Sequence, residues 1–466
     1  MLTYDLERRG GLARYDYLYR CIKEDILSGR LTAGEKLPSK RALARHLETA
    51  VVTVENAYAQ LLAEGYLRSE EKRGYFVCPV EVRPDRPPAE ETQLRQTAPR
   101  RRWLLDLSSG GSGTEGFPFS VWARLMRRVI TEEGERLLPS MPHSGALPLR
   151  QALARHIYQF RGIAADPEQI VVGAGTEYLY NLLVQLLGRD RVYGVEDPGY
   201  SKAGRVYALN GAKCVYLPVD GQGVDPARAE ESGADILHLS PNHQFPTGAV
   251  MPIARRQSLL RWAGEGPGRY LIEDDYDSEF RFTGRPIPTL RSIDRADRVI
   301  YMNTFSRSLA PSLRIGYMVL PRPLLGEYQD KLGFYSCTVP AMEQYTLARF
   351  LEEGHFDAHV NRMRVFYRAR RDAVLRAIEE SPLAGRCRAM GENAGLHFLL
   401  ELDTKLSDET LARRAEERGL RLAFLSDYQH TLAAARPHTL VVNYPGADLE
   451  YLAQALDLLT EVMGAE

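Results

Sequence analysis

Side chains that suit a flat, phosphorylated heteroaromatic ligand follow predicted strands in three segments of the chain. EDPGYS places Tyr200 after a strand, and IEDDYDSEF places Asp274 and Tyr276 at a strand end. YMNTFSRSLAPSLRIGY then offers two hydroxyls and a guanidinium: Thr304, Ser306 and Arg314. Together these groups could stack on, orient and neutralise such a ligand. Each residue alone is better explained as a loop cap or a core aromatic, so the prediction depends on their convergence.

A fourth segment, GAGTEYLYNLL, places Gly175 and Thr176 between the apolar run at 170–173 and a helix. Unpaired backbone N–H groups and the helix dipole make such a junction a natural phosphate cradle. Alone this signal is weak, because a glycine after a strand often only forms a turn.

Alternation of strands and helices would bring these segments together. Beyond Trp103, short apolar runs alternate with helical stretches, which predicts a parallel sheet buried on both faces. Ligand sites of such sheets gather at the carboxyl ends of the strands. From about residue 336 the chain adds two long helices, the strands GLHFLLEL and TLVVNY and a closing helix, which predicts a smaller α+β subdomain.

The first 79 residues have a different pattern. Leu18, Ile22 and Ile26 recur on one helix face, and Ser39 is suited to cap a second helix. A third helix follows Thr49, and YLRSEEKRGYFVCP predicts two short strands around a charged turn. Three helices and a hairpin predict a winged helix-turn-helix. Residues 80–103 are rich in proline and charge and predict a semi-extended linker.

Charge alone says little about nucleic-acid binding. The formal net charge is −1 for the 466 residues. In a winged helix the third helix enters the major groove while neighbouring residues hold phosphates. The predicted DNA contacts are four cations, a hydroxyl and a phenol: Lys40, Arg41, Lys72, Arg73, Thr53 and Tyr75.

Cysteine usage and hydropathy favour a cytoplasmic protein. The five cysteines lie far apart with no CxxC pair, which fits a reducing compartment. The N-terminal residues lack the apolar core of a signal peptide, and no stretch has the ~18 apolar residues of a membrane helix. No membrane partner is expected.

The order of residues over about 12–79 resembles the DNA-binding domain of the GntR family of bacterial regulators. ILSGRLTAGEKLPSKRALARHL, TVENAYAQLLAEGYL and GYFV carry this resemblance. One departure is at the start of the recognition helix, where the family usually has Ser-Arg and this chain has Ala50-Val51. That change removes a hydroxyl and a guanidinium that would contact phosphate or base.

From about Leu105 to the C-terminus the chain resembles fold type I aminotransferases, which bind pyridoxal 5′-phosphate. PHSGALPLRQALARH, HQFPTG and EDDYDSEF carry this second resemblance. The fusion resembles the MocR family of transcriptional regulators. The resemblance implies an aminotransferase class I/II-like domain over 104–466. Its large subdomain would span about 140–325, and its small one the N-terminal segment with about 336–466.

The resemblance also implies roles for individual residues. Gly175 and Thr176 would hold the coenzyme phosphate together with Thr304, Ser306 and Arg314. Tyr200 would stack on the pyridine ring, Asp274 would accept a hydrogen bond from the protonated ring nitrogen, and Tyr276 would bond the phenolic oxygen.

One position breaks the family pattern. The family reads T-x-S-K, with a lysine that forms the Schiff base, whereas this chain reads Thr304-Phe305-Ser306-Arg307. A guanidinium stays protonated and forms no comparable bond. Arg307 could still help to retain an anionic ligand. Its presence fits a natural loss of covalent chemistry, a deliberately altered sequence or a pocket for another metabolite. Arg436 lies near the region where aminotransferases bind the substrate carboxylate.

These observations predict a homodimeric MocR-like regulator. It would bind double-stranded promoter DNA and sense a small-molecule effector, pyridoxal 5′-phosphate or a related phosphorylated metabolite bound noncovalently, without transaminase activity. Two alternatives stay open: an aminotransferase with an appended regulatory domain, and an apo regulator that uses the second domain only as a dimerisation scaffold.

Overall fold

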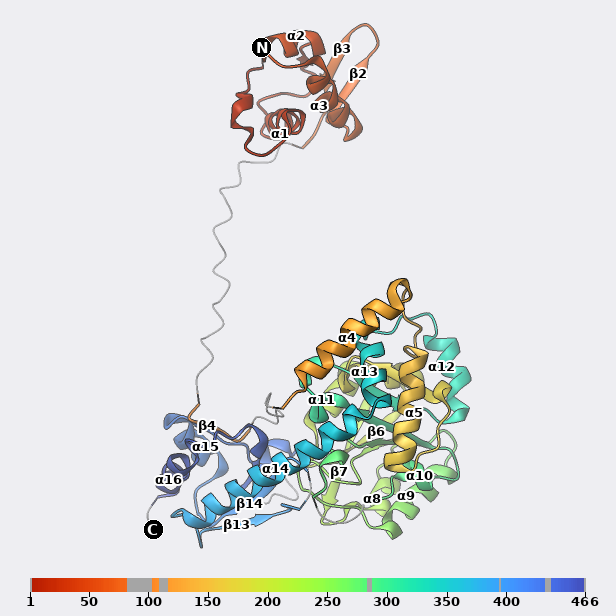
Figure 1. The fold of residues 1–466 in the computed structure, drawn as a ribbon, viewed down its shortest axis with the longest axis vertical. Helices are drawn as coiled ribbons and strands as arrows, with labels where there is room; N and C mark the ends of the chain where they lie inside the picture. Colours follow the sequence, from red (N-terminus) through yellow and green to blue (C-terminus); the bar gives the residue numbers. More distant parts are fainter. Residues whose placement is uncertain are drawn as a thin grey trace. The chain divides into compact units, whose positions relative to one another are not determined.

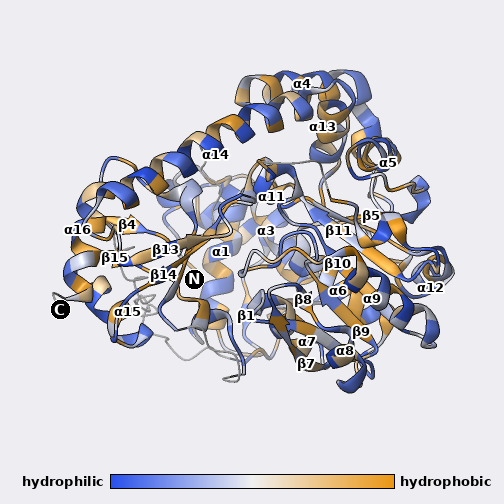
Figure 2. Cartoon of the chain, turned by 90° about the horizontal axis from the view of Figure 1, so that it is seen from below, coloured by the Kyte–Doolittle hydropathy of each residue, from blue (hydrophilic) through white to orange (hydrophobic). Residues whose placement is uncertain are grey.

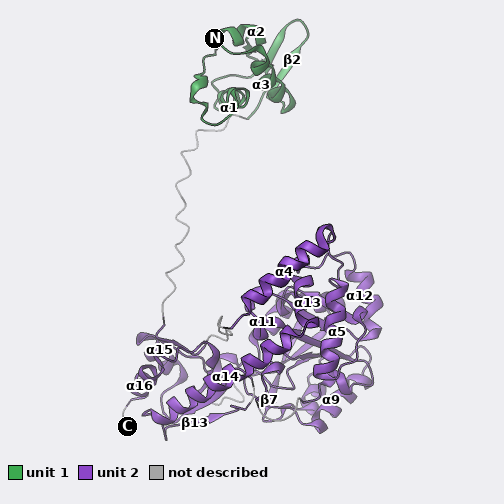
Figure 3. Cartoon of the chain, viewed as in Figure 1, with its two compact units in different colours: residues 1–101 green, residues 102–466 purple. Residues whose placement is uncertain are grey.

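The computed structural model describes residues 2–81, 103–108, 116–282, 287–393, 395–431 and 437–464. The chain divides into two compact units, Met1–Arg101 and Arg102–Glu466 (Figure 3). Most of the predicted linker, and Arg436, lie outside the described residues. No helix in the described part of the chain is long and apolar enough to cross a membrane.

The N-terminal unit is a winged helix, as predicted. Its helices are α1 (Arg14–Leu27), α2 (Lys40–His46) and α3 (Val51–Ala63), after a short 3-10 turn at Leu6–Arg9. Its strands are β1 (Lys36–Leu37), β2 (Leu67–Glu70) and β3 (Gly74–Val77), in the order β1-β3-β2. Leu18, Ile22 and Ile26 of α1 pack in one buried cluster with Val54 and Leu61 of α3. The helical apolar spacing of the sequence therefore becomes the core of this unit.

An eight-stranded sheet forms the centre of the C-terminal unit, in the order β5-β12-β11-β10-β9-β6-β7-β8. The strands are β5 (Ile170–Gly173), β6 (Val192–Asp197), β7 (Lys213–Asp220), β8 (Gly223–Val224), β9 (Ile236–Leu239), β10 (Tyr270–Asp274), β11 (Val299–Thr304) and β12 (Gly316–Val319). The pairs from β7 through β6, β9 and β10 to β11 are parallel.

The expectation of a parallel sheet is wrong at two strands. β12 runs antiparallel to both β11 and β5, and β8 runs antiparallel to β7. Only residues 305–315 join β11 to β12, which is shorter than a parallel crossover needs. Because β12 is antiparallel to both neighbours, the carboxyl ends of β5 and β11 lie at the same edge as the start of β12.

Helices cover both faces of this sheet (Figure 1). One face packs on α6 (Thr176–Leu187), α7 (Ser201–Leu209) and α12 (Leu325–Leu332). The other packs on α8 (Pro226–Glu231) and α9 (Ile253–Glu265), and on α4 (Phe119–Glu133), α5 (Leu147–Arg161) and α13 (Ala341–Glu352). Ile272 belongs to the first face and its neighbour Leu271 to the second, as the two-residue period of a strand requires. Figure 2 shows these strands as mainly hydrophobic.

The rest of this unit is a smaller α+β part. Strands β13 (Cys387–Met390), β14 (Phe398–Leu402) and β16 (Thr439–Val442) form an antiparallel sheet. Helices α14 (His355–Glu380), α15 (Asp408–Glu417) and α16 (Leu452–Met463) share one hydrophobic core with this sheet. β4 (Leu105–Asp106) pairs with β15 (Leu420–Arg421), so the segment after the linker joins the C-terminal strands.

Candidate functional site

The predicted ligand residues of the C-terminal unit lie at one edge of the large sheet. Asp274 ends β10 and Thr304 ends β11, while Gly175 follows β5 and Tyr200 follows β6. Arg314 lies two residues before β12, whose first residue is at the same edge. The topology therefore brings together residues that are far apart in the sequence.

The start of α6 is closed over by a guanidinium. Gly175 has a φ of +86°, and a Cβ there would lie 2.6 Å from Nη2 of Arg314. The same Nη2 donates to the carbonyl of Ala174 at 3.3 Å. The positive φ favours glycine at position 175, and a Cβ there would displace the flexible end of Arg314 from this cradle. Thr176 is the first residue of α6 and is half-buried.

Hydroxyls lie after β11 on the same edge. The Thr304 hydroxyl accepts from the backbone N–H of Ser306 at 3.2 Å, and the two hydroxyl oxygens are 2.9 Å apart. Thr304 Oγ1 also donates to the carbonyl of Ile315 at 3.2 Å, beside Arg314. These hydrogen bonds connect the segment after β11 to the residue that follows Arg314.

Two charged residues at this cradle were not among the predicted ligands. Glu177 pairs with Arg314 and also accepts from Lys202 Nζ at 2.9 Å. The Lys202 and Arg314 cations hold the pKa of Glu177 below its usual value against the opposing effect of burial. An anionic ligand at this cradle would share Arg314 with Glu177. The sequence did offer one indication of this, because Glu177 directly follows the predicted phosphate ligands Gly175 and Thr176.

Asp274 is a buried carboxylate with one oxygen engaged. Its Oδ2 accepts from the Tyr180 hydroxyl at 2.7 Å and lies 3.4 Å from His238 Nε2. His238 Nδ1 is in turn 2.7 Å from the Tyr207 hydroxyl. Asp274 Oδ1 is buried and has no hydrogen-bond partner among the described residues. A buried acceptor without a donor is costly, so Oδ1 is available to an N–H group of a ligand.

Tyr276 begins a second hydrogen-bonded group. Its hydroxyl lies 3.1 Å from His243 Nδ1, which lies 2.8 Å from Asp277 Oδ2. Burial raises the pKa of Tyr276 well above the usual value, so the phenol stays protonated. Burial alone would raise the pKa of Asp277, but the neighbouring His243 and, more weakly, Arg307 hold it below the usual value. Sequence reasoning did not assign a role to His243 or Asp277, although they lie within the HQFPTG and EDDYDSEF segments that carry the resemblance.

Glu196 is a further buried carboxyl at this edge. Its Oε2 accepts from the N–H of Ser240 at 3.1 Å, while Oε1 has no partner among the described residues. Burial raises the pKa of Glu196 to about 8. This side chain is therefore mainly protonated near neutral pH and adds no full negative charge beside Asp274.

Arg307 follows Ser306 on the short helix α11 (Phe305–Ser308) and is half-buried. Its positive charge acts to lower the pKa of the Tyr200 and Tyr276 phenols, opposing the effect of burial. It makes no hydrogen bond or ion pair to another residue in the described ranges. The positive charge of Arg307 therefore acts on the predicted stacking ring and on the predicted phenol.

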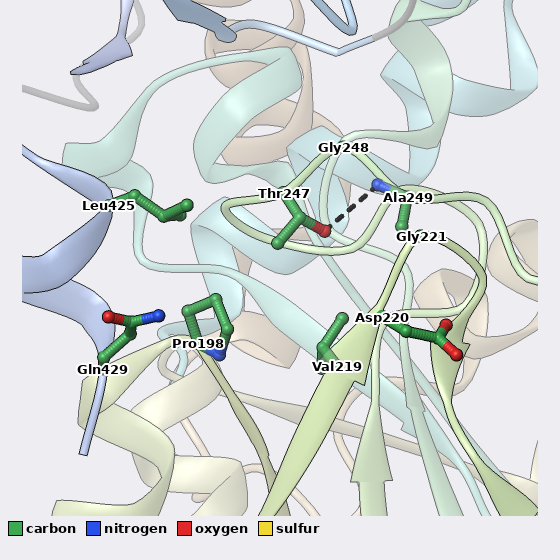
Figure 4. Close-up of a pocket in the computed structure, with 9 residues that line it drawn as sticks. All are labelled: Pro198, Val219, Asp220, Gly221, Thr247, Gly248, Ala249, Leu425 and Gln429. Atoms are coloured by element: carbon green, nitrogen blue, oxygen red, sulfur yellow. Dashed lines mark hydrogen bonds between the residues drawn. The ribbon is translucent and has the colours of Figure 1, made fainter. Parts of the chain in front are cut away.

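A cavity of about 130 Å³ lies nearby within the same unit (Figure 4). Its lining comes from the end of β7, from the loops after β6, β7 and β9 and from the small subdomain: Pro198, Val219, Asp220, Gly221, Thr247, Gly248, Ala249, Leu425 and Gln429. Its one charged group, Asp220, pairs with Arg255 at 2.6 Å. Because none of the predicted ligand residues lines it, this cavity is not the anion cradle.

The predicted DNA contacts of the N-terminal unit differ in how they are held. Lys40 pairs with Glu55 of α3 at 2.6 Å, and Arg73 pairs with Glu70 at 2.5 Å. Arg41 and Lys72 are exposed and have no hydrogen-bond or ion-pair partner within the described part of the chain.

The two remaining predicted contacts lie on or beside α3. Thr53 is half-buried in the first turn of α3. The Tyr75 ring packs edge-on against Tyr58, at 5.0 Å between centroids. Sequence could not show which cations are already paired, because Lys40 and Glu55 stand fifteen positions apart.

The two units and the site define a class of protein, a winged-helix DNA-binding domain joined to a fold type I aminotransferase domain. Comparison with known protein families gives the same two domains. Residues 14–77 match the family of bacterial regulatory proteins of the gntR type, and residues 104–456 match aminotransferase class I and II. The chain belongs to the GntR family of transcriptional regulators, in its MocR-type form.

Three known proteins illustrate this membership. The chain is 39% identical to the HTH-type transcriptional regulator YdeL of Bacillus subtilis, over 92% of this chain and 93% of the relative. It is 32% identical to the probable rhizopine catabolism regulatory protein MocR of Rhizobium meliloti, over 97% and 94%. The α-aminoadipate aminotransferase LysN of Thermus thermophilus superposes with a TM-score of 0.66 and 28% identity, over 77% of this chain and 92% of LysN. The predicted family and fold class are confirmed.

Proposed function

We propose that this regulator binds promoter DNA as a homodimer and senses pyridoxal 5′-phosphate, or a related phosphorylated metabolite, in a site without covalent attachment. The observation that carries the proposal is Asp274 Oδ1, a buried acceptor with no donor among the described residues. It lies at the same sheet edge as the cradle of Gly175 and Arg314. LysN, a relative of the same fold, is described in complex with N-(5′-phosphopyridoxyl)-L-leucine.

The residues present fit this coenzyme at each of its ends. Gly175, Thr176, Thr304, Ser306 and Arg314 would hold the phosphate; these are the N–H, hydroxyl and guanidinium groups of the cradle. Tyr200 would stack on the ring, Tyr276 would bond its phenolic oxygen, and Asp274 would accept from its ring nitrogen. Bound to a protein, the coenzyme supplies an electron sink.

Arg307 would retain the ligand electrostatically instead of covalently. Its guanidinium stays protonated, so it offers a charge-assisted hydrogen bond but no nucleophilic amine. We therefore propose that the second unit has no transaminase activity. Its role would be to bias the equilibrium between arrangements of the DNA-binding units, to the extent that the ligand prefers one of them.

Absorbance titration of the purified chain with pyridoxal 5′-phosphate and with pyridoxamine 5′-phosphate tests this proposal. We expect saturable binding, and about 10- to 100-fold weaker binding by Asp274→Asn, because a hydrogen bond to a charged group contributes about 1.5–3 kcal/mol. Asp220→Asn, in the neighbouring cavity, is the matched control and should bind normally. Failure of both compounds to bind saturably would contradict the proposal. If neither compound changes the affinity of the chain for DNA, the second unit would serve only as a dimerisation scaffold.

The cations of the N-terminal unit give a second test. Lys72 stands at the tip of the β2–β3 turn with a φ of +59° and no partner among the described residues. We expect Lys72→Gly, which tolerates that φ, to weaken binding of all duplexes alike and to reduce the salt dependence of log K by about one unit. Lys213→Gly, an exposed lysine of the other unit, should change neither quantity. If log K of Lys72→Gly depends on salt as strongly as that of the native chain, Lys72 does not contact DNA phosphate.

A further inference from the structure

The outward face of α3 contains no arginine or lysine. Val54, Ala57, Tyr58 and Leu61 are buried against the rest of the unit. The exposed positions of the helix up to Gln60 are Val51, Val52, Glu55, Asn56, Ala59 and Gln60. The helix that a winged helix inserts into the major groove therefore lacks the side chains that most often read guanine.

Two adjacent valines stand exposed where this helix begins. Val51 is 43% exposed and Val52 is 57% exposed. β-Branched residues are modest helix formers, and these two fill no core position, so neither helix propensity nor packing accounts for them. In helix-turn-helix domains the N-terminal residues of this helix contact the edges of the bases.

The neighbouring charges make an apolar contact there feasible. Glu55, one turn after Val51 and Val52, is paired with Lys40 at 2.6 Å, so its charge is compensated and its carboxylate is engaged. Arg41 of α2 has no ion-pair partner in the described ranges and can contact phosphate. Non-specific attraction to the duplex therefore does not depend on the residues at the start of α3.

Thymine is the base whose major-groove edge carries a methyl group, and apolar side chains recognise it by contact with that methyl. Asn56 lies four positions after Val52 on the same face, and an asparagine amide pairs with the major-groove edge of adenine. We infer that Val51 and Val52 read thymine methyl groups, with Asn56 on adenine, so that A·T pairs occupy the part of the operator facing the start of α3. This inference rests on DNA binding by the N-terminal unit.

Selection of duplexes from a random DNA library by the full chain, followed by replacement of single thymines with deoxyuridine, tests the inference. Deoxyuridine keeps the base pair but lacks the methyl group. We expect A·T pairs in the selected half-site and a loss of about three- to tenfold in affinity when a contacted thymine is replaced, the effect of one buried methyl group or a little more. The salt dependence should stay unchanged, unlike that of a phosphate contact.

Val51→Ala and Val52→Ala complete the experiment. Each substitution should weaken binding to the thymine duplex by about the same factor as deoxyuridine does. The affinity of each variant should no longer change when deoxyuridine replaces the thymine that the substituted valine contacts. Val365→Ala, an exposed valine of the other unit, should behave as the native chain. An enriched site indifferent to deoxyuridine, or one with G·C pairs at these positions, would overturn the thymine reading alone. Failure to enrich any duplex would overturn DNA binding itself.

Discussion

The Arg307→Lys variant, and not the native chain, is expected to retain pyridoxal 5′-phosphate permanently after treatment with borohydride. Residue 307 lies on α11, directly after the strand end at Thr304, and its charge acts to lower the pKa of both Tyr200 and Tyr276. A lysine at this half-buried position would be partly desolvated and close to the cation Arg314 of the same edge, and desolvation favours the neutral, nucleophilic amine. The native guanidinium has no such state. The measurement is the mass of the peptide that contains residue 307.

Lys202 provides the critical control for this experiment. Its Nζ donates to Glu177 at 2.9 Å, close to the cradle, and this hydrogen bond raises the pKa of Lys202. It therefore remains an ammonium and should not substitute for the missing lysine. Arg307→Gln, which has neither charge nor amine, should bind more weakly and trap nothing. Trapping on Lys202 in the native chain would contradict the noncovalent mode, and absence of trapping in Arg307→Lys would contradict the placement of residue 307.

Sequence patterns sufficed for features that depend on local periodicity. The spacing of Leu18, Ile22 and Ile26 predicted the buried face of α1, and all three are in the core. The alternation of apolar runs and helices predicted the α/β class. Placement of Asp274 and Thr304 at strand ends was enough to predict that they share an edge, because parallel strands end together.

Features set by tertiary packing could not be predicted in this way. The partners of Asp274 are Tyr180 and His238, 94 and 36 positions away, and although Tyr180 lies within GAGTEYLYNLL, nothing in that segment indicates a bond to Asp274. The antiparallel direction of β12 depends on the length of one connection. Similarly, the sequence did not show that Lys40, which stays a predicted DNA contact, pairs with Glu55.

Behind the site, a buried ion pair fixes the end of β10. Arg161 Nη2 lies 2.8 Å from Asp275 Oδ2, and the two side chains are 3% and 1% exposed. The Tyr301 hydroxyl and the Asn242 amide also donate to Asp275, each at 2.7 Å. Asp275 stands between Asp274 and Tyr276 in the sequence. The pair is therefore positioned to hold the backbone from which both proposed ligand residues project.

Arg161→Met is expected to destabilise the C-terminal unit by about 3–5 kcal/mol, since it leaves a buried carboxylate without its cation. All three tryptophans, at positions 103, 122 and 262, belong to this unit, so the fluorescence of a urea titration reports its unfolding alone. Arg228→Met breaks a pair with Glu231 whose side chains are 64% and 65% exposed, and should cost less than about 1 kcal/mol.

A double variant separates the loss of the ion pair from the loss of arginine packing. If the unpaired charge of Asp275 causes the loss of stability, Arg161→Met combined with Asp275→Asn should recover much of it. The introduced amide can still bond to Tyr301 but carries no charge. If the double variant is as unstable as Arg161→Met alone, the arginine acts through packing and not through its charge. Recovery of stability together with restored binding of pyridoxal 5′-phosphate would show that the pair serves the site by holding the strand end, since neither Arg161 nor Asp275 is among its proposed ligands.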